Sequence, residues 1–275
     1  MRRMSERLSS QGSDLLVLCD NAARAVDCAI KGMSGTVASG QMVKMGADGT
    51  PTKQIDRAAE NAVLDTLRAS GLGFKVLSEE IGEVLIGEKP DYFLHLDPLD
   101  GTFNAIAGIP FYSVSIYLSK DEFHFGYISD LARGDSYYAE AGRGAYSRLS
   151  GRLQVSTNAN ISQFSISAYT MRPHTGRIAA IGDTVRRIRT LGSTALEMAL
   201  VASGRLDAFV DLRGMMRVVD IAAGRLILEE AGGMVTDSAG EALHLDGNMW
   251  QRRDLIGSNG LQHAQLLKLI GGISH

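Results

Sequence analysis

The hydrophobic and polar positions in the first half of the chain follow two different periods. Apolar side chains recur every three or four positions in residues 13–31 and 53–70, which predicts two amphipathic helices. Shorter apolar or alternating runs predict buried strands, the last three of them antiparallel neighbours. These strands are expected at residues 74–77, 92–96, 111–119, 122–129 and 135–139. Between the predicted elements, residues 35–51 are expected to form a mobile loop or hairpin, and residues 81–91 a surface excursion.

In the second half of the chain, strand and helix patterns alternate. Strands are expected at residues 164–168, 186–190, 206–212 and 254–258. Helices are expected at residues 194–203, from Asp220 to residue 231, and at 261–270. Such alternation predicts a second layered α/β unit beside the first. We therefore predict a layered α/β fold in two halves, residues 1–158 and 159–275.

Two of the expected helices have residues near their starts that are suited to capping. Thr52 is placed to cap the helix that follows it, with Asp56 and Glu60 pointing from the first turns of that helix. Thr194 and Glu197 have the spacing of a capping box.

Composition narrows the class of protein. The chain has 275 residues, 45% of them hydrophobic, so it can bury a large core. Its 28 basic and 31 acidic residues give a net charge of -3, which argues against a nucleic-acid or anionic-membrane partner. The charged start has no apolar segment after it, and no run approaches the length of a membrane span, so a cytoplasmic protein is expected. Cys19 and Cys28 lie in one predicted helix, and both are expected to be reduced core residues.

The strongest candidate for chemistry follows the apolar strand at residues 92–96. There the chain continues Asp-Pro-Leu-Asp-Gly-Thr-Phe-Asn (residues 97–104). Pro98 keeps Asp97 extended, and Gly101 allows a close backbone approach before a helix begins. Two carboxylates beside exposed N–H groups suit a divalent cation and the phosphate that it neutralises. The alternative is an acidic turn between a strand and a helix.

This octapeptide resembles the signature of the inositol monophosphatase family, whose members are magnesium-dependent phosphatases. Two further acidic segments resemble the family in the expected order, Ser78-Glu79-Glu80 and Val219-Asp220. The resemblance implies the α-β-α-β-α sandwich of the sugar phosphatases. It also implies a mobile lid that contains Lys44, and a homodimer or homotetramer.

The resemblance assigns roles to the acidic residues. The metal ligands it implies are Glu79, Asp97, the carbonyl of Leu99, Asp100 and Asp220. These oxygen ligands favour two or three Mg²⁺ ions, with Mn²⁺ as a substitute. Together with Glu79, the pair Asp56 and Thr102 forms the catalytic set, because this pair orients the attacking water. For Asp56 and Asp220, the alternative is an acid favoured only by the dipole at a helix N-terminus.

Substrate contacts are implied at the signature and in the second half of the chain. These residues are Asp100, Gly101, Thr102, Ser193, Thr194 and Arg213, with Arg172 or Arg189 as candidates to assist Arg213. A guanidinium at Arg213 suits a second phosphate, which favours fructose 1,6-bisphosphate with inositol 1-phosphate as a further substrate. The alternative for Arg213 is a surface salt bridge.

Two other functions stay open. A 3'-phosphoadenosine phosphatase would share the acids, but that branch usually has Lys-Gly-Phe where this chain has Phe103-Asn104-Ala105. A regulatory protein on the same fold would act by binding a partner such as RNA polymerase. The complete acid set favours an enzyme with a small sugar or polyol phosphate as substrate.

Overall fold

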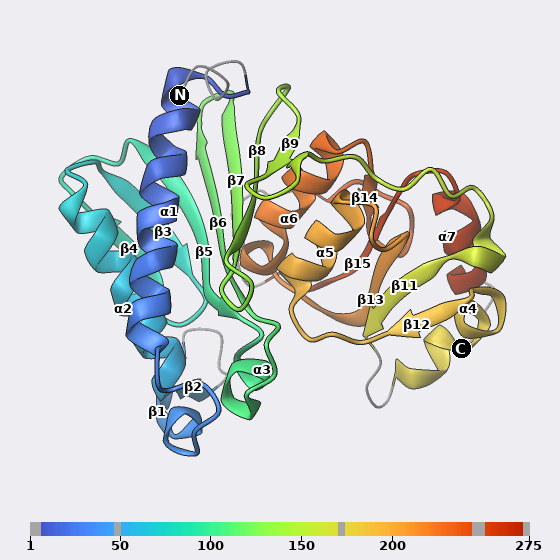
Figure 1. The fold of residues 1–275 in the computed structure, drawn as a ribbon, viewed down its shortest axis with the longest axis horizontal. Coiled ribbons are helices and arrows are strands. Elements are labelled where there is room, and N and C mark those ends of the chain that lie inside the picture. The colour runs from blue at the N-terminus through green and yellow to red at the C-terminus, as the bar shows by residue number, and fades with distance from the viewer. Residues whose placement is uncertain (1–6, 47–50, 170–173, 244–250, 272–275) are drawn as a thin grey trace.

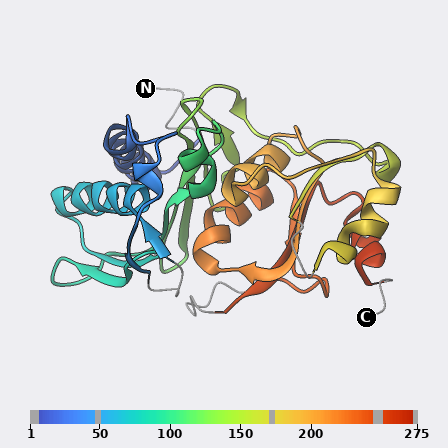
Figure 2. The ribbon, with the colours of Figure 1, turned by 90° about the horizontal axis from the view of Figure 1, so that it is seen from below.

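The computed structural model describes residues 7–46, 51–169, 174–243 and 251–271. Its elements stack in five layers (Figures 1 and 2). Two N-terminal helices cover an eight-stranded sheet, two central helices separate this sheet from a five-stranded one, and two smaller helices cover the far side. The predicted layered α/β fold is thereby confirmed.

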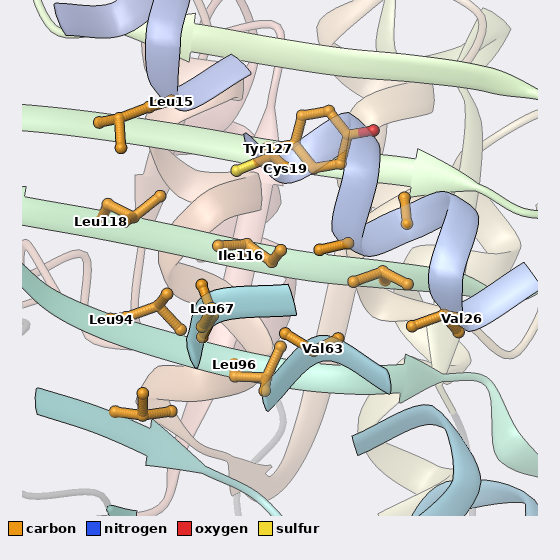
Figure 3. Packing of buried hydrophobic residues seen from close by; sticks show 14 of the residues in the cluster. Leu15, Cys19, Val26, Val63, Leu67, Leu94, Leu96, Ile116, Leu118 and Tyr127 are labelled. Carbon is orange, nitrogen blue, oxygen red and sulfur yellow. The ribbon is translucent and has the colours of Figure 1, made fainter. Parts of the chain in front are cut away.

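The outer layer of the first half consists of α1 (Ser10–Ile30) and α2 (Gln54–Ala69), which pack against each other. Ser9 caps α1 by accepting a hydrogen bond from Gly12 N–H. The apolar stripes of both helices face the sheet, where their side chains meet those of β5, β6 and β7 (Figure 3). The amphipathic spacing of the sequence therefore builds the first core.

The eight-stranded sheet has the order β10-β9-β8-β7-β6-β5-β3-β4. Its strands are β3 (Phe74–Ser78), β4 (Gly82–Ile86), β5 (Tyr92–Asp100), β6 (Ser113–Lys120), β7 (Phe123–Asp130), β8 (Asp135–Glu140), β9 (Ala145–Ser147) and β10 (Gly151–Arg152). Only β3 and β5 run parallel, so both end at the same edge of the sheet. The expected surface excursion after residue 80 instead contains the edge strand β4, because Gly82 turns the chain back onto β3.

The five-stranded sheet has the order β12-β11-β13-β15-β14. Its strands are β11 (Ser165–Tyr169), β12 (Arg187–Arg189), β13 (Ala208–Met216), β14 (Met234–Thr236) and β15 (Arg253–Ser258). Between the two sheets lie α5 (Thr194–Ala202) and α6 (Val218–Glu230), which are apolar on nearly all sides because both faces are covered. On the far side lie α4 (Ala179–Thr184) and α7 (His263–Gly271).

Several shorter elements join these layers. They are β1 (Met42–Met45), β2 (Pro51–Lys53), α3 (Thr102–Ala107) and the 3₁₀ helices η1 (Ala38–Gly40), η2 (Ile161–Gln163) and η3 (His174–Ile178). β1 and β2 pair antiparallel, as the predicted hairpin requires. The eight-stranded sheet uses strands before residue 158 and the five-stranded sheet strands after it, yet α6 packs against the first sheet. The division into two halves at that residue stays a prediction.

Three local expectations are wrong. The N-cap position of α2 is Lys53, whose N–H donates to Asp56, and the Thr52 hydroxyl instead donates to the Glu80 carboxylate. The residue that caps α5 is Ser193, while Glu197 accepts from Ser167 and Leu191, so Thr194 and Glu197 do not form a capping box. Cys28 is exposed on α1 and is not a core residue, although Cys19 is buried and both are free.

None of the helices in the described ranges combines the length and apolar character needed to cross a bilayer.

Candidate active site and metal centre

The acidic residues from distant parts of the chain meet in a pocket of about 490 Å³ between the two sheets. Its walls come from the ends of β3 and β5, the start of α3, β13 and the starts of α5 and α6. Every metal ligand predicted from the sequence lines this pocket: Glu79, Asp97, Leu99, Asp100 and Asp220.

Asp97 and Asp100 sit at the end of β5, where the pairing with β6 is irregular. The regular register with β6 holds up to Asp97 and resumes at Asp100. This irregularity lets the Asp97 carboxylate accept a hydrogen bond of 3.0 Å from Leu99 N–H. Asp97 is buried, so the strand delivers a carboxylate into a site largely withdrawn from water.

Glu79 follows β3, and a buried acid braces the turn that carries it. The Glu60 carboxylate on α2 accepts from the Ser78 hydroxyl at 2.6 Å and from Ile81 N–H at 3.0 Å. These two contacts lie on either side of Glu79 and Glu80. Ser78 therefore has a buried partner in Glu60, a contact that was not predicted from the sequence.

Glu79, Asp97 and Asp220 form a cluster in which one oxygen of each lies within 4.8 Å of the others. Burial raises the pKa of Glu79 to about 8, with the Arg217 charge opposing the rise and the Asp220 charge adding to it. Burial, and then the charges of Glu79 and Asp100, raise the pKa of Asp97 well above its usual value. Three carboxylates this close repel one another unless a cation lies among them.

Arg217 supplies a positive charge at this cluster, and the sequence analysis missed it. Its Nη2 atom lies 2.6 Å from Glu79 Oε1 and 2.8 Å from Asp220 Oδ1. The signal was present in the sequence, because an arginine three positions before an aspartate at a helix start has the spacing of an ion pair.

Asp100 is not part of the cluster of three acids, and its carboxylate is held at the N-terminus of α5. Its carboxylate accepts from the Ser193 hydroxyl at 2.5 Å, from Thr194 N–H at 3.1 Å and from Ala195 N–H at 2.8 Å. Burial raises the pKa of Asp100 to about 6, and these hydrogen bonds oppose the rise. In this arrangement Asp100 ties the first sheet to α5, and its role as a metal ligand stays a prediction.

Asp56 and Thr102 are in direct contact, as the sequence resemblance led us to expect. The Thr102 hydroxyl lies 2.7 Å from Asp56 Oδ1 and 3.0 Å from the Leu99 carbonyl oxygen. Asp56 Oδ2 accepts from Lys53 N–H at the start of α2. Burial raises the pKa of Asp56, while the hydrogen bond from Thr102 opposes that rise.

Two glycines let the signature loop lie against the loop before α5. Gly101 has φ of 95°, and a Cβ there would lie 3.0 Å from the Phe111 carbonyl oxygen and 3.1 Å from that of Gly192. Gly192 has φ of 97°, and a Cβ at this position would lie 2.8 Å from Asn104 Nδ2, closer than a Cβ can pack. The Asn104 side chain donates to the carbonyls of Phe111 and Leu191, at 2.8 and 2.7 Å. This asparagine fastens the two loops together.

The predicted substrate residues divide into two groups. Gly101, Thr102, Thr194 and Arg213 line the pocket, and Ser193 lies at its edge through its bond to Asp100. Arg189 is exposed on β12 and is not among the lining residues, Lys44 is exposed on β1, and Arg172 lies outside the described residues.

Arg213 both forms a salt bridge and lines the pocket, so the two interpretations left open by the sequence, a salt bridge and a substrate contact, are compatible. Its guanidinium pairs with the buried Asp211, at 2.5 Å between Nη2 and Oδ2, and stacks over the Tyr169 ring at 4.5 Å from the centroid. It also lines the pocket. The salt bridge therefore holds the guanidinium at the wall of the site rather than on an outer surface.

The donor set fits a hard divalent cation. Clustered carboxylate oxygens without a cysteine or histidine among them are the ligands that Mg²⁺ and Mn²⁺ take. Glu79, Asp97 and Asp220 would hold the ion. Leu99 lines the same pocket, and its carbonyl oxygen accepts from the Thr102 hydroxyl.

Fold and site together define a layered α/β protein with a cluster of three carboxylates in a pocket, and comparison with known proteins identifies its family. The profile of the inositol monophosphatase family matches residues 15–274, so the chain belongs to that family. A fructose-1,6-bisphosphatase/inositol-1-monophosphatase of Methanothermobacter thermautotrophicus is 38% identical, over 90% of this chain and 93% of its own length.

A second relative has an additional activity in its name. The bifunctional NADP phosphatase/NAD kinase of Methanococcus maripaludis is 37% identical over 94% of this chain, which spans only 49% of that relative. Among solved structures, a hypothetical Pyrococcus horikoshii protein described as similar to inositol-1 monophosphatase superimposes with a TM-score of 0.82. It is 32% identical, over 96% of this chain and 99% of its own. The fold is thus the layered α/β fold of the sugar phosphatases.

Proposed function

We propose that the chain is a metal-dependent phosphomonoesterase that hydrolyses phosphate esters of sugars and polyols. The observation that carries this proposal is the cluster of Glu79, Asp97 and Asp220, in a pocket shared with the Asp56–Thr102 pair. Family membership and the names of two relatives support it. A divalent cation bound there would neutralise the phosphate charge and make a bound water more acidic.

In this proposal the Asp56–Thr102 pair aims the water at phosphorus. Thr102 donates its hydroxyl hydrogen bond to Asp56. The lone pairs of Thr102 Oγ1 are therefore left to accept a hydrogen bond from the water. Asp56 is itself fixed by Lys53 N–H, so its carboxylate keeps one orientation toward the threonine. No covalent bond between the protein and the phosphoryl group is required.

For the substrate we propose fructose 1,6-bisphosphate, with inositol 1-phosphate as a second ester. Arg213 supports this choice because its planar guanidinium is fixed by Asp211 and Tyr169 at the wall of the pocket. A fixed guanidinium suits a second phosphate, since it presents paired donors without further ordering. Arg252 lines the same pocket and adds positive charge.

A phosphorylated dinucleotide is the second candidate substrate. The name of the Methanococcus maripaludis relative includes NADP phosphatase, and the pocket wall contains Tyr169, Met215 and Met216, apolar groups against which a base or nicotinamide ring could pack. The metal site would be the same for both candidates.

Phosphate release from fructose 1,6-bisphosphate, inositol 1-phosphate and NADP, compared with Mg²⁺ present, tests the proposal. We expect the bisphosphate to be hydrolysed fastest and the monophosphate more slowly. Faster release from NADP would favour the dinucleotide, and no release from any of the three would contradict the proposed activity.

Arg213→Met tests the substrate assignment. If Arg213 binds a second phosphate, the variant loses most activity toward the bisphosphate and keeps activity toward the monophosphate. An equal loss toward both esters would show that Arg213 only holds Tyr169 and β13 in place, and the assignment would fail.

A further inference from the structure

We propose that Arg217 is a built-in counter-cation of the acidic centre, and that its guanidinium must leave Glu79 and Asp220 before a divalent cation can bind there. The inference rests on the metal site of the proposed function and is independent of the substrate. It makes metal binding an exchange of one cation for another.

The position of a single nitrogen carries the inference. Arg217 Nη2 lies 2.6 Å from Glu79 Oε1 and 2.8 Å from Asp220 Oδ1, so it bridges two of the three clustered acids. A second contact joins Nε to Asp220 Oδ2 at 3.1 Å. The Arg217 side chain is 12% exposed, and those of Glu79 and Asp220 are 21% and 9% exposed. The guanidinium therefore occupies the space between two carboxylates, as a bound cation would.

If Arg217 kept its contacts with Glu79 and Asp220, they would oppose the binding of a divalent ion to these acids. Mg²⁺ coordinates oxygens at about 2.0–2.1 Å and needs lone pairs that point at the ion, while Arg217 already binds Glu79 Oε1 and Asp220 Oδ1. The permanent charge of the guanidinium would also lie within a few ångströms of the ion in a poorly hydrated site, where like charges repel strongly.

The local structure lets the guanidinium leave without unwinding the helix. The N-terminus of α6 is capped by a separate bond of 2.8 Å, from the backbone N–H of Arg217 to Asp220 Oδ2. Arg217 also lines the 490 Å³ pocket, so its side chain has space to turn into without disturbing the core. The side-chain contact and the backbone cap are thus separable.

The expected consequence is a trade between stability and metal affinity. Without metal, the guanidinium offsets part of the repulsion among Glu79, Asp97 and Asp220, and leaving these acids without it is costly. With metal, the same contact must be broken, so it lowers the affinity for the ion. Linkage makes the two effects reciprocal.

Arg217→Met and Arg252→Met form a matched pair for the test. Both remove one arginine charge from the same pocket, but Arg252 is exposed and contacts the Met215 sulfur instead of the acids. Titration calorimetry of metal-stripped protein with Mn²⁺ measures affinity directly. We expect Arg217→Met to bind Mn²⁺ roughly 5- to 100-fold more tightly than the wild type, and Arg252→Met to differ by less than about twofold.

Thermal unfolding supplies the second readout. In excess EDTA we expect Arg217→Met to unfold at a lower temperature than the wild type, and saturating Mg²⁺ to remove or reverse this difference. If Arg217→Met does not fold, Arg217→Lys is decided by the same affinity criterion, because a lysine nitrogen cannot keep all the contacts of the guanidinium.

Unchanged or weaker metal binding by the Arg217 variant, with normal binding by the wild type, would overturn this inference alone. Tighter binding by both the Arg217 and Arg252 variants would also overturn it, because any positive charge in the pocket would then act alike. Absence of metal binding by the wild type would overturn the proposed function and this inference with it.

Discussion

Asp56 and Asp220 each take part both in a helix start and in the site, and Asp220 Oδ2 also accepts from Arg217 Nε. The Oδ2 atoms accept from Lys53 N–H and Arg217 N–H, which caps α2 and α6. The Oδ1 atoms face Thr102 and the Glu79–Arg217 pair. The two interpretations of these acids, helix capping and site chemistry, are therefore compatible, because one side chain can serve both.

Substitution of Thr102 tests the water-orienting pair at the level of a single hydroxyl. Thr102→Val removes the hydroxyl that Asp56 fixes and keeps the side-chain shape. We expect kcat for phosphate release to fall roughly 100-fold or more, with a small change in KM. Thr102→Ser restores the hydroxyl and should recover most of kcat. Comparable loss in both variants would rule out a role for the hydroxyl.

Asp97→Asn tests the innermost acid of the cluster. It removes one charge from the donor set, so we expect phosphate release to fall at least about 100-fold and Mg²⁺ binding to weaken. Asp130→Asn is the control, since Asp130 is equally buried at the end of β7, outside the pocket. Activity and metal affinity close to wild type in Asp97→Asn would exclude Asp97 as a ligand.

At the scale of elements, α5 and α6 determine how the two sheets meet. Both helices are buried on nearly all sides, and their N-termini face Asp100 and the acidic cluster. The close approach of α6 to the first sheet depends on Gly126 of β7. A Cβ at that glycine would lie 3.0 Å from the Ala223 carbonyl oxygen and 3.3 Å from its Cα.

Gly126→Ala tests this contact. Because the nearest atoms belong to the α6 backbone, either the helix or the strand must shift, at a cost of about 1 to 3 kcal/mol. The melting temperature should fall by several degrees. Gly176→Ala, where a Cβ would meet nothing within 4 Å, should change it by less than a degree or two. Equal melting temperatures for the two variants would contradict the close packing of α6.

Glu197 binds the loop before α5, and its raised pKa makes the stability of the fold depend on pH. It is fully buried, and its Oε1 accepts from Leu191 N–H and the Ser167 hydroxyl. Burial raises the pKa of Glu197 to about 7 in the folded protein. Because the folded protein holds the carboxyl proton more tightly than the unfolded chain, the protonated Glu197 stabilises the fold. This contribution is complete below the pKa that Glu197 has in the unfolded chain, and it is lost as pH rises through the folded-state pKa of about 7.

The test compares wild type with Glu197→Gln at saturating Mg²⁺. We expect the melting temperature of the wild type, relative to the variant, to fall by about 5 °C between pH 5 and pH 8.5. Glutamine does not titrate, so the variant supplies the baseline that the other acids share. A difference that stays constant with pH, or grows toward high pH, would contradict the raised pKa.

Sequence patterns predicted the long elements better than the short ones. The amphipathic spacing of α1 and α2 and the apolar runs of β5 and β6 were sufficient, because burial of one face imposes a period. β4, β9, β10 and β14 were missed, since two to five residues carry too little periodicity. Thr52 and Glu197 were misassigned as capping residues because both form longer-range hydrogen bonds, to Glu80 and to Ser167.

At the scale of the whole molecule, the site exists only because the layers stack. Asp56 comes from α2, Glu79 from the end of β3, Asp97 from β5 and Asp220 from α6. Local pattern predicts each acid at the end of a strand or the start of a helix, but their convergence came from the resemblance to a family. Arg217 and Asn104 were not assigned roles in advance. Asp220 is only three positions from Arg217, but the other partner of Arg217, Glu79, and the Leu191 carbonyl that Asn104 binds lie far away in the sequence.

The most direct test of the account is phosphate release from fructose 1,6-bisphosphate by protein stripped of metal with EDTA, before and after Mg²⁺ is returned. The acidic cluster predicts no release while the chelator is in excess, and full recovery with Mg²⁺, because Glu79, Asp97 and Asp220 cannot neutralise a phosphate by themselves. Release that persists in excess EDTA would contradict a metal-dependent phosphatase.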